Sequence, residues 1–338
     1  MGFLNLARAA EDLYNRHVSR LRAGVIGTGS MGRNHVRVLA ECPDVDLIGI
    51  ADPDTEKTDE LASRFGCDRF EDYRALIERG LDLAIVSVPT SMHHIVAMDV
   101  IDSGSHVFVE KPIADTIEHA YEITRRANNA GKKVFVGHIE RFNPAVESAK
   151  RVLENGDCGE ILCVSNLRVG KRNVRILDTG IILDLGTHDI DLISYLLGMQ
   201  ATSVFCVAKK NERGFEDSAS LMLEFPGGKS GIIETSWQMP YKVRKIFVTG
   251  EEGFLLVDLI EVKVALLHEK FVAEVPTVKE EPLVRQLNSA IACIREDKAP
   301  VVDGVASTYT LSTALAAIES YNERRTIEIM PFQMARAL

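Results

Sequence analysis

The sequence predicts an α/β protein with an N-terminal, doubly wound parallel sheet of the Rossmann type and a C-terminal α+β domain with a mostly antiparallel, open sheet. Three observations predict this fold class. Apolar runs rich in β-branched residues alternate with helical stretches over residues 21–137, and this rhythm changes after Arg141. The chain of 338 residues is also longer than one ordinary hydrophobic core organises, so two folded domains are expected.

The first half of the chain has the pattern of a parallel sheet. Continuous apolar strands joined by segments long enough for crossover helices are typical of a sheet that is covered on both faces. We therefore expect a Rossmann domain over 21–140. The strand-like runs are RAGVIG (22–27), VDLIGIAD (45–52), DLAIVSVP (82–89), HVFVEKP (106–112) and KVFVGH (133–138).

The second half, over 141–338, has the pattern of an α+β domain. Between Ala201 and Phe271, extended runs are separated by turn residues such as Pro226 and Gly227, which predicts a mostly antiparallel sheet. Few helices are available to cover this sheet, so one face should expose apolar side chains, and we expect a homodimer or a homotetramer. The expected helices are 144–155, 184–197, 282–296 and 305–321.

Composition and charge narrow the class of protein. The 39 basic and 49 acidic side chains give a formal charge of −10, which would repel a nucleic-acid backbone. No run of about 18 apolar residues is present, so no membrane-spanning helix is predicted. Residues 1–20 mix charged and apolar side chains, which indicates an amphipathic helical extension rather than a signal peptide. Because the six cysteines also include no CxxC pair, a reduced protein of the cytoplasm is expected.

A glycine-rich turn follows the first apolar run. The sequence GVIGTGSMG places Gly27, Gly29 and Gly32 between a predicted strand and a predicted helix. In a dinucleotide-binding turn, such glycines allow a tight bend, close approach of the backbone to the pyrophosphate, and close packing of the helix on the strand. The intervening Ser30 and Met31 would begin the helix whose N-terminus meets the phosphates.

An acidic residue ends the next predicted strand. Asp52 follows Gly32 by 20 residues, a position from which a carboxylate can hold both hydroxyls of a ribose. The same carboxylate would repel the 2′-phosphate of NADP, so NAD is the expected cofactor. Two alternatives stay open: Asp52 could be a turn residue before Pro53, and the nearby Arg33 could accept a phosphate.

The segment VPTSMHH follows the run at 82–89, at the edge of the sheet where ligands bind in open α/β folds. Pro89 and Thr90 would line the dinucleotide, and His93 could face it. Taken alone, His93 and His94 are better explained as surface or capping residues at the start of a helix, and only their place in the sheet favours a role at the cofactor.

The motif EKP ends the run at 106–112. Glu110 and Lys111 are expected at the same edge of the sheet, beside the dinucleotide. A lysine at this position could donate a hydrogen bond to the substrate and stabilise a developing alkoxide. The alternative is an exposed lysine at the end of a strand.

A second set of candidate residues lies in the segment DLGTHDID. Asp184 and His188 are four residues apart, and Asp191 and Tyr195 continue the same face of a predicted helix. An imidazole titrates near neutral pH, and a carboxylate can orient it or bind a sugar hydroxyl. A structural Asp–His pair or a metal site would use the same residue types. No further pair of ligand residues stands nearby, so no metal is predicted.

Taken together, GTGSMG, the Asp52 position, PTSMHH, EKP, GHIERFNP (137–144) and DLGTHDID resemble the glucose-fructose oxidoreductase, inositol dehydrogenase and rhizopine catabolism family. The resemblance covers nearly the whole chain after Leu21. It implies an NAD-dependent oxidoreductase in which Lys111 and His188 are catalytic and Asp184 binds the substrate. The second hypothesis, a non-catalytic regulator that binds a dinucleotide and a sugar, would be indicated by loss of the lysine or the histidine, and both are present.

Within this family, GHIERFNP, RVGKR (168–172) and DTGIILDLGTHDID (178–191) resemble the sugar-nucleotide 3-dehydrogenases. This resemblance implies oxidation of UDP-N-acetylglucosamine at C3, with UDP-N-acetylglucosaminuronate, a free sugar and inositol as alternatives. Local basic residues would suit a diphosphate, although ordinary surface arginines are an equal alternative. The basic residues are Arg141, Arg168, Lys171, Arg172 and Arg175, of which Arg141, Arg168 and Arg172 are the predicted substrate contacts.

Overall fold

The computed structural model describes residues 20–171 and 179–329. The helical extension predicted at 1–20 therefore lies, apart from Arg20, outside the described residues. Among the helices that are described, none is long and apolar enough to cross a membrane.

The chain forms two compact units, and each draws on two stretches of sequence. Unit 1 contains the chain up to Gly137 and also Leu283–Val305. Unit 2 contains His138–Pro282 and the chain from Ala306 onward. The segment Leu283–Val305 thus returns to unit 1, although the sequence pattern groups it with the second half.

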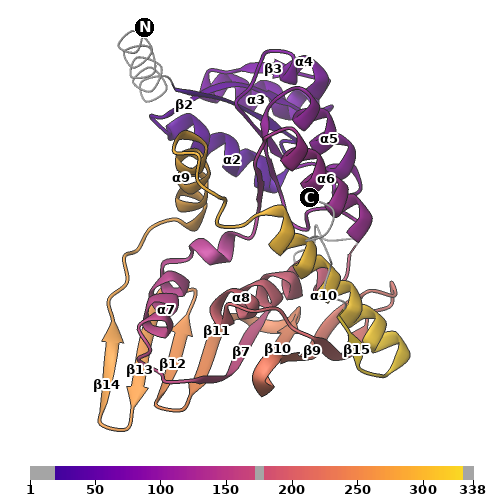
Figure 1. The fold of residues 1–338 in the computed structure, drawn as a ribbon. Helices are drawn as coiled ribbons and strands as arrows, with labels where there is room; N and C mark the ends of the chain where they lie inside the picture. The colour runs from indigo at the N-terminus through magenta and orange to yellow at the C-terminus, as the bar shows by residue number, and fades with distance from the viewer. Residues whose placement is uncertain (1–19, 172–178, 330–338) are drawn as a thin grey trace, which may run out of the picture. The chain divides into compact units, whose positions relative to one another are not determined.

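Unit 1 is built on a six-stranded parallel sheet with the strand order β3-β2-β1-β4-β5-β6 (Figure 1). The chain begins in the middle of the sheet, runs outward to β3, returns beside β1 at β4 and continues to β6, which is the predicted doubly wound topology. The edge strand β3 is absent from the predicted runs because its three residues are polar or only partly buried. The strands are β1 (Leu21–Ile26), β2 (Val45–Ala51), β3 (Asp68–Phe70), β4 (Leu83–Val86), β5 (His106–Val109) and β6 (Val134–Val136).

Helices cover both faces of this sheet. In the first half of the unit α2 packs against α3, and in the second half α5 packs against α6. This pairing is expected when right-handed crossovers run in opposite directions from the middle of the sheet. Side chains that accept a backbone N–H begin three of the helices: Asp54 at α3, Asp72 at α4 and Thr116 at α6. The helices are α2 (Ser30–Glu41), α3 (Thr55–Phe65), α4 (Tyr73–Ile77), α5 (Thr90–Asp102), α6 (Ile117–Asn129) and α9 (Pro282–Arg295).

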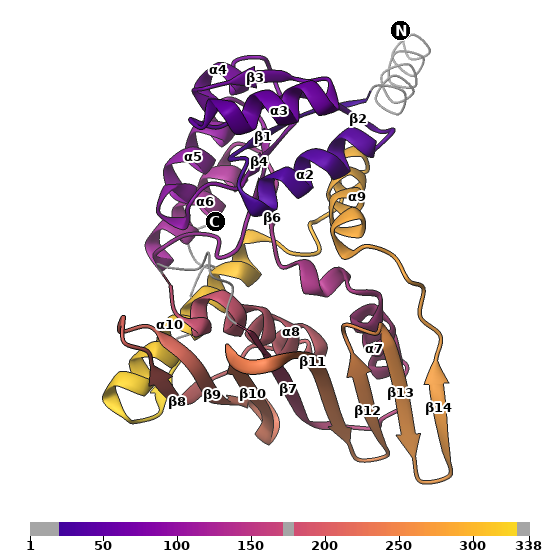
Figure 2. The same ribbon diagram turned by 180° about the vertical axis from the view of Figure 1, so that it is seen from behind.

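The contacts of α9 explain why it belongs to unit 1. Gln286 donates a hydrogen bond of 3.2 Å to the carbonyl of Val136 at the end of β6. Arg295 pairs with Asp44 at 2.6 Å, and Leu287 is fully buried. Both views of the ribbon show α9 beside α2 (Figures 1 and 2). The amphipathic pattern predicts this helix, but no local signal indicates the sheet to which it returns.

Unit 2 is built on a nine-stranded sheet with the order β14-β13-β12-β11-β7-β10-β9-β8-β15. All neighbours are antiparallel except β7 and β10, which confirms the predicted, mostly antiparallel sheet. The strands are β7 (Ile161–Lys171), β8 (Ser203–Lys210), β9 (Glu216–Phe225), β10 (Lys229–Ser236), β11 (Gln238–Gly250), β12 (Gly253–Asp258), β13 (Lys263–His268), β14 (Phe271–Val275) and β15 (Ile327–Glu328). The helical segments are η1 (Ile139–Phe142), α7 (Pro144–Glu154), η2 (Ile182–Gly186), α8 (Thr187–Leu197), η3 (Pro226–Gly228) and α10 (Gly304–Glu323).

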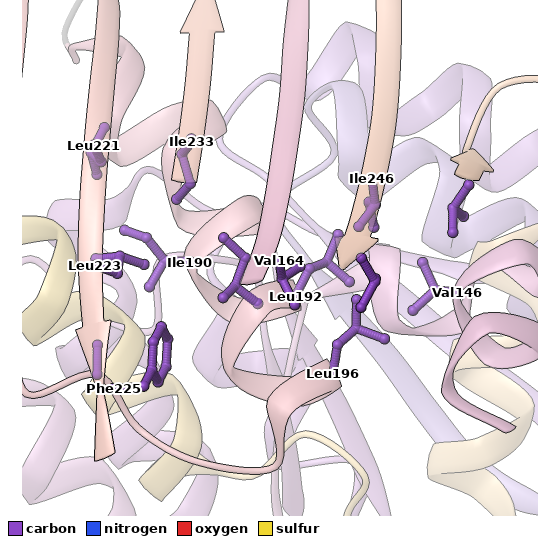
Figure 3. Close-up of a cluster of buried hydrophobic side chains, with 14 of the residues drawn as sticks. Val146, Val164, Ile190, Leu192, Leu196, Leu221, Leu223, Phe225, Ile233 and Ile246 are labelled. Atoms are coloured by element: carbon purple, nitrogen blue, oxygen red, sulfur yellow. The ribbon is translucent and has the colours of Figure 1, made fainter. Parts of the chain in front are cut away.

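The core of unit 2 forms where the helices meet one face of this sheet. Val164, Ile233 and Ile246 of the central strands gather with Ile190 and Leu192 of α8, as Figure 3 shows, and all five side chains are fully buried. Burying one side chain of this size contributes about 1.5–3 kcal/mol. The core therefore determines which face of the sheet α8 covers.

The opposite face of the sheet contains a row of large apolar side chains. Phe205, Met222 and Ile232 are register neighbours on β8, β9 and β10. Met222 is 59% exposed, and its chain neighbours Leu221 and Leu223 are buried on the other face. The predicted apolar, uncovered face is therefore present on the described strands of unit 2.

The fold also makes a prediction about stability. His106 at the start of β5 accepts a backbone hydrogen bond from Lys133, and burial together with the charges of Lys132 and Lys133 lowers the pKa of His106 to about 4. In the unfolded chain this histidine has an ordinary pKa of about 6.5, so at a pH between about 4 and 6.5 it is protonated in the unfolded chain and neutral in the folded chain. The contribution of His106 to the free energy of unfolding should thus be fully present above a pH of about 6.5 and decrease as the pH falls toward about 4.

This dependence is tested by urea titrations between pH 7.5 and pH 4.5. In the variant His106→Asn, the free energy of unfolding should depend less steeply on pH, by the equivalent of up to one proton taken up on unfolding. The same slope in the variant and the wild type would exclude His106 as the source of the pH dependence.

Candidate active site

The glycine-rich turn connects β1 to α2 in unit 1. Gly27 has a φ of +89°, and a Cβ there would lie 2.4 Å from the carbonyl oxygen of Ser87. A Cβ at Gly32 would lie 1.9 Å from the carbonyl oxygen of Gly27, so α2 packs on the turn as closely as glycine permits. At Gly29, in contrast, no described atom lies within 4 Å of the Cβ position. The turn is closed on the protein side and open at Gly29, as the approach of a pyrophosphate requires.

Asp52 holds this turn in place. Its Oδ2 accepts hydrogen bonds from the backbone N–H of Thr28 at 2.7 Å and from the Thr28 hydroxyl at 3.1 Å. Its Oδ1 accepts from the backbone N–H of Asp54 at 2.9 Å, just before α3 begins. The two roles predicted as alternatives for Asp52, a turn residue and a ribose-binding residue, are thus compatible. Its carboxylate holds the loop by hydrogen bonds and also lines the adjacent pocket.

A pocket of about 400 Å³ opens beside the turn, at the carboxyl ends of β1, β2 and β4. Of the predicted cofactor residues, Gly27, Gly29, Asp52 and Pro89 line it. Ser30 and Met31 form the first turn of α2, where no described side chain caps the backbone N–H groups. An open Gly29, an uncapped helix N-terminus and a largely apolar pocket fit the pyrophosphate and adenosine parts of a dinucleotide. The pocket is lined by Ile26, Gly27, Gly29, Ala51, Asp52, Pro53, Glu71, Tyr73, Ser87, Val88, Pro89 and Met92.

Glu110 ties the EKP motif to α2. Its Oε1 lies 2.7 Å from Nε2 of the fully buried His35, and its Oε2 accepts from the backbone N–H of Lys111 at 3.3 Å. Burial alone would raise the pKa of Glu110, but the hydrogen bond and charge of His35 and the charge of Lys111 hold it below its usual value. Glu110 therefore joins the end of β5 to α2, and it is not among the residues that line the pocket. His35 is not among the predicted residues, because it stands three residues after Gly32 with no signal beyond its residue type.

His93 joins the ends of two strands. Its ring nitrogens lie 2.8 Å from the carbonyl oxygen of Pro112 and 3.0 Å from that of Val88, and the side chain is 1% exposed. Burial lowers the pKa of His93, although both carbonyl contacts oppose this effect. The described geometry gives His93 a bracing role, and neither it nor Thr90, the first residue of α5, lines the pocket.

The DLGTHDID segment of unit 2 is not one uniform helix. Asp184 lies in the π-helical turn η2, whereas His188 lies in the first turn of α8, and both are half-buried. A π-helical turn is wider than an α-helical turn and frequently occurs at functional sites. The helix predicted over 184–197 is therefore π-helical up to Gly186 and α-helical from Thr187. Among the described residues, no group of three or more His, Cys, Asp or Glu side chains is arranged to hold a metal ion.

Arg141, a predicted substrate contact, points into unit 2. Its Nε and Nη2 donate to the two carboxylate oxygens of Asp191 at 2.8 and 2.7 Å, and its guanidinium lies over the ring of Tyr195 at 4.8 Å. Arg141 is 8% exposed. Asp191 and Tyr195, which the sequence places on one face with His188, thus hold η1 against α8.

Arg168, the second predicted substrate contact, is also internal. It is 2% exposed, donates from Nε to both oxygens of Asp189 at 3.0 and 2.9 Å, and donates from Nη1 to Glu140 at 2.7 Å. The same Glu140 oxygen accepts from Nη1 of Arg244 at 2.9 Å. Burial alone would raise the pKa of Glu140, but the charges of Arg168 and Arg244 hold it below its usual value. Glu140, Asp189 and Arg244 are not among the residues predicted from the sequence.

The remaining basic candidates are less fully described. Lys171 is exposed at the end of β7, and the predicted contact Arg172, like Arg175, lies outside the described residues.

Two alanine substitutions separate packing from cofactor contact in the glycine turn. Gly32→Ala should lower the free energy of unfolding by about 1–3 kcal/mol, because the new methyl group overlaps the Gly27 carbonyl. Gly29→Ala should leave stability unchanged and raise the Kd for NAD about tenfold, a loss of about 1.4 kcal/mol, because its methyl group projects into the open side of the turn. Thermal unfolding and calorimetric titration with NAD measure the two effects. Unchanged NAD affinity in Gly29→Ala would remove the turn from the cofactor site.

Two family descriptions match the chain. "Oxidoreductase family, NAD-binding Rossmann fold" matches residues 21–138, and "GFO/IDH/MocA C-terminal domain" matches residues 146–256. The first match covers the six-stranded sheet and the glycine turn of unit 1. The second covers most of the nine-stranded sheet of unit 2 together with η2 and α8.

Individual relatives match along nearly the whole chain. The scyllo-inositol 2-dehydrogenase (NAD(+)) of Bacillus subtilis is 26% identical over 330 residues, which is 92% of this chain and 96% of the relative. The UDP-N-acetylglucosamine 3-dehydrogenase of Acidithiobacillus ferrooxidans is 27% identical over 317 residues, with 90% and 99% covered. A solved structure of the latter protein has a TM-score of 0.84 at 25% identity and covers 90% of this chain and 98% of its own. The chain belongs to the GFO/IDH/MocA family of oxidoreductases, and its N-terminal domain is an NAD-binding Rossmann domain.

Proposed function

We propose that this protein oxidises a ring hydroxyl of a sugar, with NAD as the hydride acceptor. The observation that supports this most strongly is the position of Lys111. It follows β5 at the carboxyl edge of the parallel sheet, the same edge at which the glycine turn and the 400 Å³ pocket lie. Ligands of open α/β sheets bind at this edge, so a lysine there is suited to contact both the cofactor and its substrate.

The proposed reaction divides its work among three residues. Bound NAD would accept the hydride from the ring carbon. His188 takes the proton of the hydroxyl group, Lys111 donates a hydrogen bond to the same oxygen as negative charge develops on it, and Asp184 positions the sugar or His188. Either Lys111 or His188 could be the final base. The braces at Glu110 and His93 support this assignment because they hold the backbone on both sides of Lys111.

The proposed substrate is UDP-N-acetylglucosamine, oxidised at C3 to the 3-keto sugar nucleotide. Two observations favour it: the sequence resemblance over 137–144 and 178–191, and the relative from Acidithiobacillus ferrooxidans. The relative from Bacillus subtilis, an inositol dehydrogenase by name, favours a free polyol as the second candidate.

A substrate panel tests this proposal. Purified protein is incubated with NAD and, separately, with UDP-N-acetylglucosamine, UDP-N-acetylglucosaminuronic acid, free N-acetylglucosamine and myo-inositol, and NADH is measured by absorbance. UDP-N-acetylglucosamine should have the highest kcat/KM. A higher kcat/KM for myo-inositol would show that the substrate is a polyol and not a nucleotide sugar. If none of the four compounds is oxidised, a non-catalytic binding protein is favoured.

His188→Ala in the same assay should lower kcat by about 100-fold to 10,000-fold, the range expected for loss of a general base. The Kd for NAD should not change. His268→Ala, a matched control on β13 of the same unit, should retain full turnover. Equal turnover in His188→Ala and the wild type would remove His188 from the chemistry.

We also propose that the protein is a homo-oligomer, paired through the apolar face of the unit 2 sheet. Met222→Glu introduces a charge in the row that joins Phe205 and Ile232, and it should convert the oligomer to single chains. Light scattering at micromolar concentration measures the mass. Ile95→Glu, which changes an exposed residue of α5 in unit 1, is the control that should keep the oligomer. A wild-type mass equal to one chain would exclude the proposal.

A further inference from the structure

Two basic residues of β11, Lys242 and Arg244, are not used by the proposed reaction. Arg244 stands opposite Arg168 in the register of β11 and β7, and both guanidinium groups donate to the same oxygen of Glu140. The two arginines differ in exposure. The side chain of Arg168 is 2% exposed, whereas that of Arg244 is 32% exposed and Lys242 is exposed to solvent.

The charges in this cluster are separated by burial. Arg168 binds the two buried carboxylates, Glu140 and Asp189, whereas Arg244 and Lys242 reach the surface. Asp184, which is half-buried, is a further carboxylate whose charge acts on Arg244. Repulsion from Arg244 together with partial burial lowers the pKa of Lys242. The exposed end of the cluster is therefore positive on a protein whose formal charge is −10. An excess of positive charge that is partly withdrawn from water favours binding of an anion.

The cluster lies at the N-terminal end of α8, next to His188 and to the turn η2 that contains Asp184. Asp189 follows His188 directly in the chain, and Arg168 binds Asp189 at 2.9 Å. Glu140 then links Arg168 to Arg244, because it accepts a hydrogen bond from each. The charge of Asp184 also acts on Arg244. All of these residues belong to unit 2. A sugar held by Asp184 and His188 would thus have the exposed edge of Arg244 within its surroundings.

We propose that Arg244 and Lys242 bind the diphosphate of a nucleotide-sugar substrate, in the role that the sequence suggests for Arg168. The planar guanidinium suits two oxygens of a phosphate, and the ammonium of Lys242 adds a mobile point charge. Glu140 fixes the orientation of the Arg244 fork through Nη1. This assignment rests on the proposed sugar oxidation and specifies the group by which the substrate is selected.

The test compares Lys242→Gln and Arg244→Gln with Lys245→Gln. Lys245 is the control because it is exposed on the same strand and pairs with Asp258 at 3.6 Å. Each of the first two changes should raise the KM for UDP-N-acetylglucosamine by about tenfold or more, as loss of a charge-assisted contact predicts. The kcat and the Kd for NAD should stay within about twofold of the wild type. Calorimetric titration of the NAD-loaded protein with UDP gives a readout that does not depend on turnover, and both variants should weaken UDP binding.

The outcomes separate this inference from the proposed function. If UDP-N-acetylglucosamine is oxidised with an unchanged KM in both variants, the diphosphate site is wrong and the sugar oxidation stands. If the KM for free N-acetylglucosamine rises equally, the effect is structural and the inference fails. An effect confined to UDP-N-acetylglucosaminuronic acid would assign the cluster to the sugar carboxylate instead. If the wild-type protein oxidises only myo-inositol and does not bind UDP, the nucleotide-sugar proposal and this inference both fail. The exposed Lys242 keeps the test decisive should Arg244→Gln fail to fold.

Discussion

The arrangement of unit 2 depends on the ion pairs of one buried residue, Arg168 of β7. This residue is 2% exposed, and its guanidinium group binds both Glu140 of η1 and Asp189 of α8. A charge without water is costly, and removal of one partner from such a network typically costs about 3–5 kcal/mol. The three elements must therefore dock together, and their docking places the start of α8, with His188, over the central strands. The π-helical turn that contains Asp184 leads directly into this anchored helix.

Unit 1 uses smaller braces at the carboxyl edge of its sheet. His35 binds Glu110 from α2, and His93 lies between the carbonyls of Val88 and Pro112. Together with Asp52, these contacts fix the backbone on each side of the glycine turn and of Lys111. Such supporting contacts make a cofactor site more precise, because they limit the positions that the residues around the cofactor can adopt.

Local patterns in the sequence were sufficient for some residues of the site and insufficient for others. Gly27, Gly29 and Asp52, which line the pocket, could be predicted because a tight turn, an open backbone and an acid at a strand end follow from residue type and spacing. Arg168 was placed in the site for its charge alone. Its partners Asp189 and Glu140 stand 21 and 28 residues away in the chain, so no local pattern indicates that it is buried.

The sequence by itself determined the two classes of sheet, the glycine-rich turn between β1 and α2 and the family to which the chain belongs, because periodicity, glycine sterics and motif spacing act over a few neighbouring residues. The tertiary structure alone decided that α9 returns to unit 1, that the DLGTHDID segment opens with a π-helical turn, and that Arg244 rather than Arg168 has an exposed guanidinium edge. The physical reason is that burial and charge pairing depend on which distant segments pack together.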